Sequence, residues 1–106
     1  MNLWYSEKEK KIMEPFYKKI HEFLAKGKTV FRFMYNDSSL IVKYDTEADS
    51  DNELDLDDPN YEDFLEMYFQ ILKVEKKQKE EKYRKNKYLC INYHNIPDEF
   101  EVVDLS

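Results

Sequence analysis

A chain of 106 residues is long enough for one modest hydrophobic core, so we expect a single domain over residues 1–106. Nine tyrosines, seven phenylalanines and one tryptophan supply apolar area to bury, which excludes a disordered tail although 38% of the residues are charged. One cysteine excludes an internal disulfide, and no run is long and apolar enough for a signal peptide or a membrane span. We therefore expect a soluble cytoplasmic protein with no membrane partner.

The first predicted element is a helix over residues 6–26. Ser6 and Glu9 fit a capping box, in which a hydroxyl and a carboxylate satisfy amide groups of the first turn. Pro15 removes an amide donor, so either the helix kinks there or its strong part begins near Glu14. Apolar residues recur at steps of three and four and predict a stripe that faces the core: Met13, Phe16, Tyr17, Ile20, Phe23 and Leu24.

After Gly27, the residue type that ends helices in the left-handed conformation, two strands are predicted over residues 28–35 and 39–45. Both segments are rich in β-branched and aromatic residues. Asn, Asp and Ser at positions 36–38 suit a tight turn between them. The pattern therefore predicts an antiparallel hairpin.

The middle of the chain alternates acidic and apolar residues. This spacing predicts that Leu54 and Leu56 face the core while the carboxylates between them face water. Asp58 followed by Pro59 is a helix start signal, an acidic cap before proline at the first helical position. We therefore expect a helical segment over residues 60–66.

The last third of the chain is less clear. Residues 65–75 fit a helix or a strand, and their aromatic and β-branched content favours a short helix that gives way to a strand near Met67. Residues 73–87 form a charged connection, or extend a helix if the helical alternative holds. Strands are predicted over 88–96 and 99–105. The expected fold is α+β, an N-terminal helix packed on an antiparallel sheet of three to five strands with an acidic loop or short helix inserted.

Charge is concentrated in residues 45–72, which hold eleven acidic residues and neither lysine nor arginine. The rest of the chain carries 12 acids and 17 bases, so the net charge of −6 comes from a weakly basic body and one strongly acidic block. Such a block suits a basic or cationic partner. The alternative is that the block forms an acidic surface that only aids solubility.

A calcium loop is the first chemical possibility for this block. Counted from Asp51, acids occupy loop positions one, three, five, seven and twelve, the last being Glu62. Position six, where the sharp turn needs glycine, is Leu56, and position nine is Pro59. The pattern therefore argues against an EF-hand and favours weak, adventitious binding of divalent cations instead, and we expect no metal cofactor.

Other constellations for chemistry are weak. Cys90 and His94 lie on one face of the predicted strand but roughly 13 Å apart, too far for a nucleophile and its base. We therefore expect Cys90 to be a small buried apolar residue and His21 to lie at the rim of the helical stripe. Two histidines cannot form a spaced zinc site, and one glycine cannot form a phosphate loop. No enzymatic activity is expected.

The basic run 73–87 carries eight bases and three acids. It could contact nucleic acid, but the acidic block and the overall negative charge oppose such a partner. A solvated, charge-laced segment is the better interpretation.

The order of helix, hairpin, the acidic segment DNELDLDDPNYEDF and the strand LCINYHNIPDEF resembles small acidic immunity proteins of bacterial toxin–immunity systems. The resemblance covers most of the chain and includes no catalytic motif. It implies an inhibitor that binds a cognate toxin, often a nuclease with a cationic active site. An acidic surface would attract such a basic partner and mimic phosphates.

We therefore predict a non-enzymatic immunity protein, or antitoxin, that neutralises a basic toxin domain and needs no cofactor. The alternative is an adaptor or a homodimer that uses an aromatic-rich sheet face. Tyrosine and phenylalanine in the block would add aromatic anchors, which dominate the energy of an interface when buried. The predicted partner-binding residues are Glu53, Asp55, Asp57, Asp58, Tyr61, Glu62, Asp63, Phe64 and Glu66.

Overall fold

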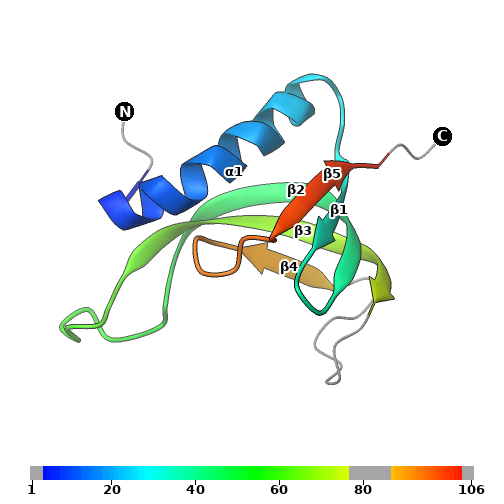
Figure 1. Ribbon diagram of the computed structural model, residues 1–106. Coiled ribbons are helices and arrows are strands. Elements are labelled where there is room, and N and C mark those ends of the chain that lie inside the picture. The colour runs from blue at the N-terminus through cyan, green and yellow to red at the C-terminus, as the bar shows by residue number, and fades with distance from the viewer. Residues whose placement is uncertain (1–3, 77–86, 104–106) are drawn as a thin grey trace.

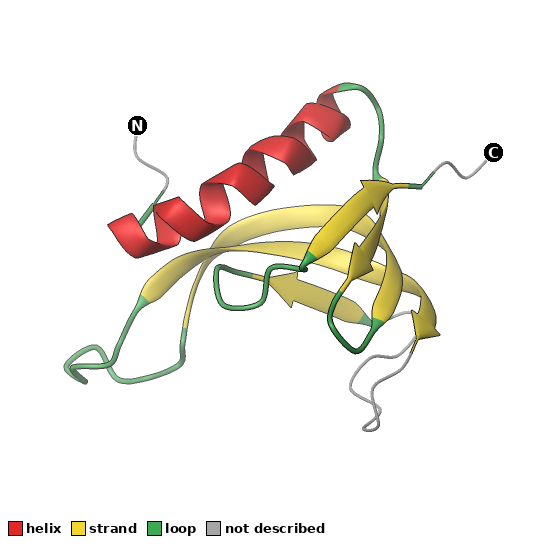
Figure 2. Ribbon diagram, viewed as in Figure 1, coloured by secondary structure: helices red, strands yellow, loops and turns green. Residues whose placement is uncertain are grey.

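The computed structural model describes residues 4–76 and 87–103. One helix lies across a five-stranded antiparallel sheet, as Figures 1 and 2 show, which confirms the predicted α+β class. The strand order across the sheet is β4-β3-β2-β1-β5. The elements are α1 (Glu7–Ala25), β1 (Val30–Met34), β2 (Ser39–Asp51), β3 (Asp63–Lys76), β4 (Tyr88–Ile91) and β5 (Glu99–Val102).

Helix α1 begins and ends as predicted. The Ser6 hydroxyl accepts a hydrogen bond from the Glu9 amide at 3.0 Å, the first half of the capping box. At the other end, Gly27 has a φ of 78°, which glycine adopts without steric cost. The helix continues through Pro15, so its strong part does not begin near Glu14. The Pro15 side chain is exposed, where the ring meets water rather than the core.

Strands β1 and β2 form the predicted hairpin, closed by backbone hydrogen bonds between Tyr35 and Ser38. Strand β2 then continues to Asp51, well beyond the predicted end at residue 45, because β3 pairs with it along its length. The helical segment expected over 60–66 is wrong. Strand β3 begins at Asp63, where it pairs with Asp51 of β2, and β4 joins its other side over residues 67–70.

The two short strands confirm the later predictions in part. Strand β4 ends at Ile91 rather than 96, and β5 lies inside the predicted 99–105 segment. Strand β3 runs to Lys76, so the helical alternative is wrong for residues 73–76 of the charged connection. Residues 77–86 of that connection lie outside the described residues. Residues 92–98 join β4 at one edge of the sheet to β5 at the other, and within this segment Tyr93 belongs to the core cluster and Ile96 packs against it.

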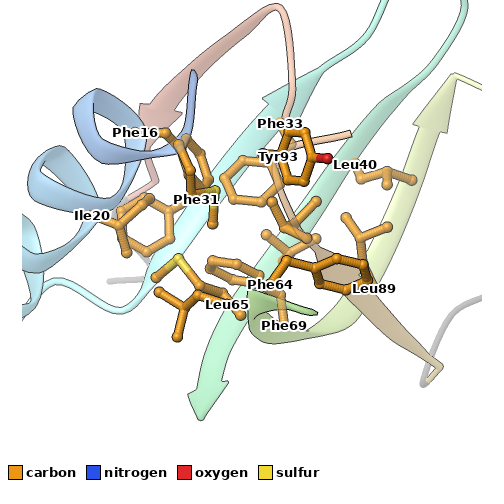
Figure 3. Close-up of a cluster of buried hydrophobic side chains, with 14 of the residues drawn as sticks. Phe16, Ile20, Phe31, Phe33, Leu40, Phe64, Leu65, Phe69, Leu89 and Tyr93 are labelled. Carbon is orange, nitrogen blue, oxygen red and sulfur yellow. The ribbon is translucent and has the colours of Figure 1, made fainter. Parts of the chain in front are cut away.

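The core lies between helix α1 and one face of the sheet, and Tyr93 from the segment after β4 belongs to the same cluster (Figure 3). Phe16 of α1 packs edge-on against Phe33, with ring centroids 5.7 Å apart. Of the predicted helical stripe, Phe16 and Ile20 are buried, while Phe23 and Leu24 are half-buried against the same cluster. The stripe therefore faces the sheet, as the spacing predicts.

No helix among residues 4–76 and 87–103 is both long and apolar enough to cross a membrane.

Candidate partner-binding surface

Strands β2 and β3 extend past the N-terminal end of α1 and are joined by a loop over residues 52–62 (Figure 1). We call residues 47–66 the acidic hairpin. Its loop is organised around the Asn52 side chain, which donates to the Asn60 carbonyl at 2.8 Å. The oxygen of the same amide accepts from the amides of Leu54 at 3.4 Å and Glu62 at 3.3 Å. The loop is thus a built turn held by side-chain contacts to the backbone.

Carboxylates within the loop cap its turns. Asp51 accepts a hydrogen bond from the Glu53 amide at 2.8 Å, and Asp58 accepts one from the Asn60 amide at 2.8 Å. Each acid bonds the amide two residues ahead, the pattern of an Asx turn. Asp58 and Pro59 therefore start a turn rather than the predicted helix. Glu53 has a φ of 64°, which is rare for a residue other than glycine.

The tip of the loop exposes acids and leucines together. Glu53, Asp55 and Asp57 are exposed, and Asp58 is half-buried. The prediction that the leucines between them face the core is wrong, because Leu54 is 41% exposed and Leu56 is 83% exposed. The acidic and apolar residues do alternate, but this loop lies past the last β2–β3 pair, Asp51 and Asp63. The loop therefore has no core beneath it.

One face of the acidic hairpin gathers carboxylates beside two tyrosines. Asp51 lies directly opposite Asp63 in the strand register, and Asp49 lies two residues along on the same face. Tyr61 donates to Asp63 at 2.7 Å, and this bond raises the pKa of Tyr61 to about 12. Asp49 likewise raises the pKa of Tyr5 through a side-chain hydrogen bond, which shows that the segment before α1 reaches this face.

The other face is tied to the turn that follows β4. Tyr93 donates to one carboxylate oxygen of Glu62, and His94 bonds the other. The hydrogen bond from Tyr93, and after it the one from His94, holds the pKa of Glu62 below its usual range. Glu66 accepts from the Asn92 side chain at 3.0 Å. Glu62 and Glu66 therefore hold the hairpin against the turn that follows β4.

Phe64 was predicted as an aromatic anchor for a partner, but its side chain is only 5% exposed. Its ring packs edge-on against Tyr93 and His94, with centroids 6.4 Å and 6.0 Å away. Figure 3 shows Phe64 and Tyr93 within the same buried cluster. Phe64 thus offers little surface to a partner and instead packs the base of the hairpin. Tyr61 is half-buried and sits at the surface beside Asp63.

A buried carboxylate joins this hairpin to the helix. Glu9 is fully buried, and its two oxygens accept from the amides of Tyr5 and Leu65, each at 2.7 Å. The capping box predicts a bond back to the first turn, and Tyr5 supplies it from one residue earlier than expected. The bond to Leu65 lies just past the end of the β3–β4 pairing, so Glu9 satisfies an amide that β4 does not reach.

A second polar cluster lies at the base of the acidic hairpin, around the single carboxylate of Glu47. Glu47 accepts hydrogen bonds from His21 at 2.6 Å and from Tyr44 at 2.8 Å. Burial, and then the bond to Glu47, raises the pKa of Tyr17 to about 12 and raises that of Tyr44 as well. His21 lies at the rim of the helical stripe with its side chain 38% exposed, which confirms its predicted position.

The residues considered for catalysis do not form a site. Cys90 is exposed, so its predicted burial is wrong, because its side chain points to the sheet face opposite α1. Partial desolvation and the charge of Glu66 raise the pKa of the thiol, which disfavours the reactive thiolate. His94 lies in the turn after β4 instead of on the same strand. Over the described ranges, no group of three or more His, Cys, Asp or Glu side chains could hold a metal ion.

Sequence reasoning missed three features of this surface: exposed Leu54 and Leu56, Tyr5 at its edge, and the Glu9 anchor. The acidic flanks of each leucine were a usable signal, since a core strand rarely carries five acids around two leucines. The Glu9 contact to Leu65 had no signal, because it joins residues 56 positions apart.

Comparison with known protein families gives the match that follows. The family model described as "Cognate immunity protein YxxD" matches residues 11–104. No curated protein matches the chain, and no solved structure matches it.

Proposed function

The chain belongs to the YxxD family of cognate immunity proteins, and we propose that it neutralises its toxin as a non-enzymatic inhibitor whose acidic hairpin binds a basic surface of the toxin. The family match carries the toxin-neutralising role. The choice of surface comes from the geometry of the hairpin.

The observation that most favours this surface is the pairing of Asp51 directly opposite Asp63. Like charges that face each other across two strands destabilise a sheet, by about 0.2–1 kcal/mol for a pair of this kind. Lysine and arginine are absent from residues 45–72, so nothing in that segment offsets the repulsion. A cationic partner would remove this cost upon binding, since its charges would lie against the same carboxylates.

The tip residues divide into two roles. Glu53, Asp55 and Asp57 are exposed and supply the field that accelerates encounter with a basic surface. Leu56 and Tyr61 supply apolar contact area, and such area slows dissociation once it is buried. The mixture of one highly exposed leucine with surrounding acids suits an interface that has an apolar centre and a charged rim.

Three of the predicted contact residues support this surface from behind it. Glu62 holds Tyr93 and His94, Glu66 holds Asn92, and Phe64 packs beneath them. Asp58 caps the loop and Asp63 accepts from Tyr61, so these two acids shape the tip as well as charging it. Substitution of any of these acids would change the shape of the surface and its charge at once, and substitution of Phe64 would change its shape. The exposed tip is therefore the better place for a test.

The test compares Asp57→Lys with Glu22→Lys, an exposed acid on α1 whose reversal changes the net charge equally. Binding kinetics to the toxin captured from the producing cells are measured at several salt concentrations. We expect Asp57→Lys to slow association about tenfold at low salt, with the difference shrinking as salt screens exposed charges. If both variants associate equally fast, the hairpin does not steer the toxin.

Leu56→Ala tests the apolar part of the same surface. Burial of a leucine side chain contributes about 1.5–3 kcal/mol, so its truncation to alanine should raise the dissociation rate about tenfold or more at every salt concentration. Leu54, on the same loop but half as exposed, provides the matched control. An unchanged dissociation rate for Leu56→Ala would remove this leucine from the interface.

A further inference from the structure

A second surface lies between helix α1 and strand β5, away from the acidic hairpin (Figure 1). It is a groove of about 810 Å³. Its helix side presents Ile12, Phe16 and Phe23, and its strand side presents Phe100 and Val102. Ile12 is 41% exposed, although it is a large apolar residue.

One wall of the groove is an unpaired strand edge. Among residues 4–76 and 87–103, strand β5 is the last strand of the sheet and pairs with β1 alone. The Val103 amide donates to the Val30 carbonyl at 2.9 Å. Because hydrogen-bonding direction alternates along an antiparallel strand, residues 99, 101 and 103 direct their backbone groups to β1. Phe100 and Val102 therefore direct their N–H and C=O groups outward, along the rim of the groove.

We propose that this groove binds an extended segment of a partner chain, which adds a sixth strand to the sheet beside β5 and alternates apolar with basic residues. The outward backbone groups of β5 would bond the added strand. Its apolar side chains would enter the groove beside Phe100 and Val102, because residues opposite each other in adjacent strands share a face.

Charge selects the basic residues of the occupant. Asp98 and Glu99 are exposed at the start of β5, and Glu101 lies on the same face as Glu99. Arg32 already forms an ion pair with Glu101. Lysine or arginine at alternate positions of an added strand would lie against these acids. The opposite face of the same strand is apolar, so an alternating occupant matches both faces.

The same charges oppose a second copy of this chain as the occupant. Two copies of β5 that pair antiparallel about a two-fold axis, over at least three residues each, have two registers that keep their faces matched. One register sets Glu99 opposite Glu101 of the second copy, and the other sets Glu101 opposite itself. Like charges directly opposite destabilise a strand pair.

The test uses a short capped peptide that alternates lysine and valine as the probe. Its binding is followed by the amide chemical shifts and hydrogen exchange of the intact protein. We expect saturable shifts at Ile12, Phe16 and residues 99–102, with slower exchange of the Phe100 and Val102 amides. A peptide that alternates glutamate and valine should have a dissociation constant at least about tenfold higher.

Two variants separate strand addition from simple charge attraction. Val102→Pro removes an outward N–H and leaves the bonds of β5 to β1 in place, so it should weaken lysine–valine peptide binding about tenfold with little change in folding. Glu99→Lys adds a like charge at an exposed position and should weaken the peptide severalfold. If Val102→Pro lowers the melting temperature strongly, Glu99→Lys and the exchange of the Val102 amide still decide the outcome.

Three results would overturn the proposal. The first is the absence of any shift at residues 99–102, and the second is a set of shifts confined to the acidic hairpin. The third is concentration-dependent shifts at β5 without peptide, which would assign the groove to a second copy. None of these results bears on toxin binding by the hairpin, because that function is measured with Asp57→Lys and Leu56→Ala.

Discussion

Glu9 provides the most demanding test of how the hairpin is held. Its carboxylate is fully buried and satisfies two backbone amides, Tyr5 and Leu65, each at 2.7 Å. Glu9→Ala leaves both donors without that partner. A buried donor left unsatisfied costs about 1–3 kcal/mol. The Leu65 bond is buried and the Tyr5 bond is partly buried, so we expect a loss of about 2–4 kcal/mol in unfolding free energy.

Glu9→Gln should fall between the parent and the alanine variant. The amide oxygen can keep one hydrogen bond, but the NH2 group then faces the other amide donor. Glu7→Ala is the matched control, because Glu7 lies in the same helical turn, carries the same charge and is exposed. Its loss removes only a favourable charge near the start of the helix, about 0.3–1 kcal/mol.

The assay is urea denaturation at equilibrium, combined with hydrogen exchange at the Leu65 amide. The urea midpoint should be highest for Glu7→Ala, lower for Glu9→Gln and lowest for Glu9→Ala. The dependence of the unfolding free energy on urea concentration should stay constant. Exchange at Leu65 should accelerate more than exchange in β1, since the contact is local. If Glu9→Ala costs no more than Glu7→Ala, the reasoning that a buried carboxylate secures this hairpin is refuted.

Three further outcomes are expected. Asp51→Asn keeps the oxygen that caps the turn and removes the charge opposite Asp63, so urea unfolding should show a gain of about 0.2–1 kcal/mol that shrinks in high salt. Because the folded state lowers the pKa of Glu62, its contribution is present above the unfolded pKa and is lost as pH falls through the folded pKa. Tyr93→Phe should therefore destabilise at neutral pH more than in acid, and an equal loss in urea unfolding at both pH values would contradict this. Phe23→Ala should cost less than the 3–5 kcal/mol typical of a fully buried phenylalanine, because the ring is half-buried; a thermal melt checks it.

Local sequence patterns were sufficient to predict helix α1 and the first hairpin. The apolar stripe of α1, its Ser6 cap and its stop at Gly27 all depend on residues within a few positions of one another. The same holds for the β1–β2 hairpin, whose two strands are joined by a short turn. Local period and turn chemistry are sufficient in such cases, since the residues that set the pattern and the stop signals lie within one short segment.

Tertiary structure decided the segments that pair over long distances. Residues 60–66 have a helix start signal and partial helical spacing, yet residues 63–66 belong to β3 because residues 48–51 of β2 offer them backbone partners. Leu54 and Leu56 have the alternation of a core strand, yet they lie at an exposed tip because the register places the core elsewhere. Periodicity predicts which side chains of a segment share a face, but not whether that face lies against the core.

The acidic block illustrates both limits. Its charge is visible in the sequence, and that charge is enough to favour a cationic partner. Which of its acids face water and which hold the fold was decided by contacts between distant residues, such as Glu62 with Tyr93 and Asp51 with Asp63. Those contacts depend on where β4 ends and how β2 meets β3, which no local pattern encodes.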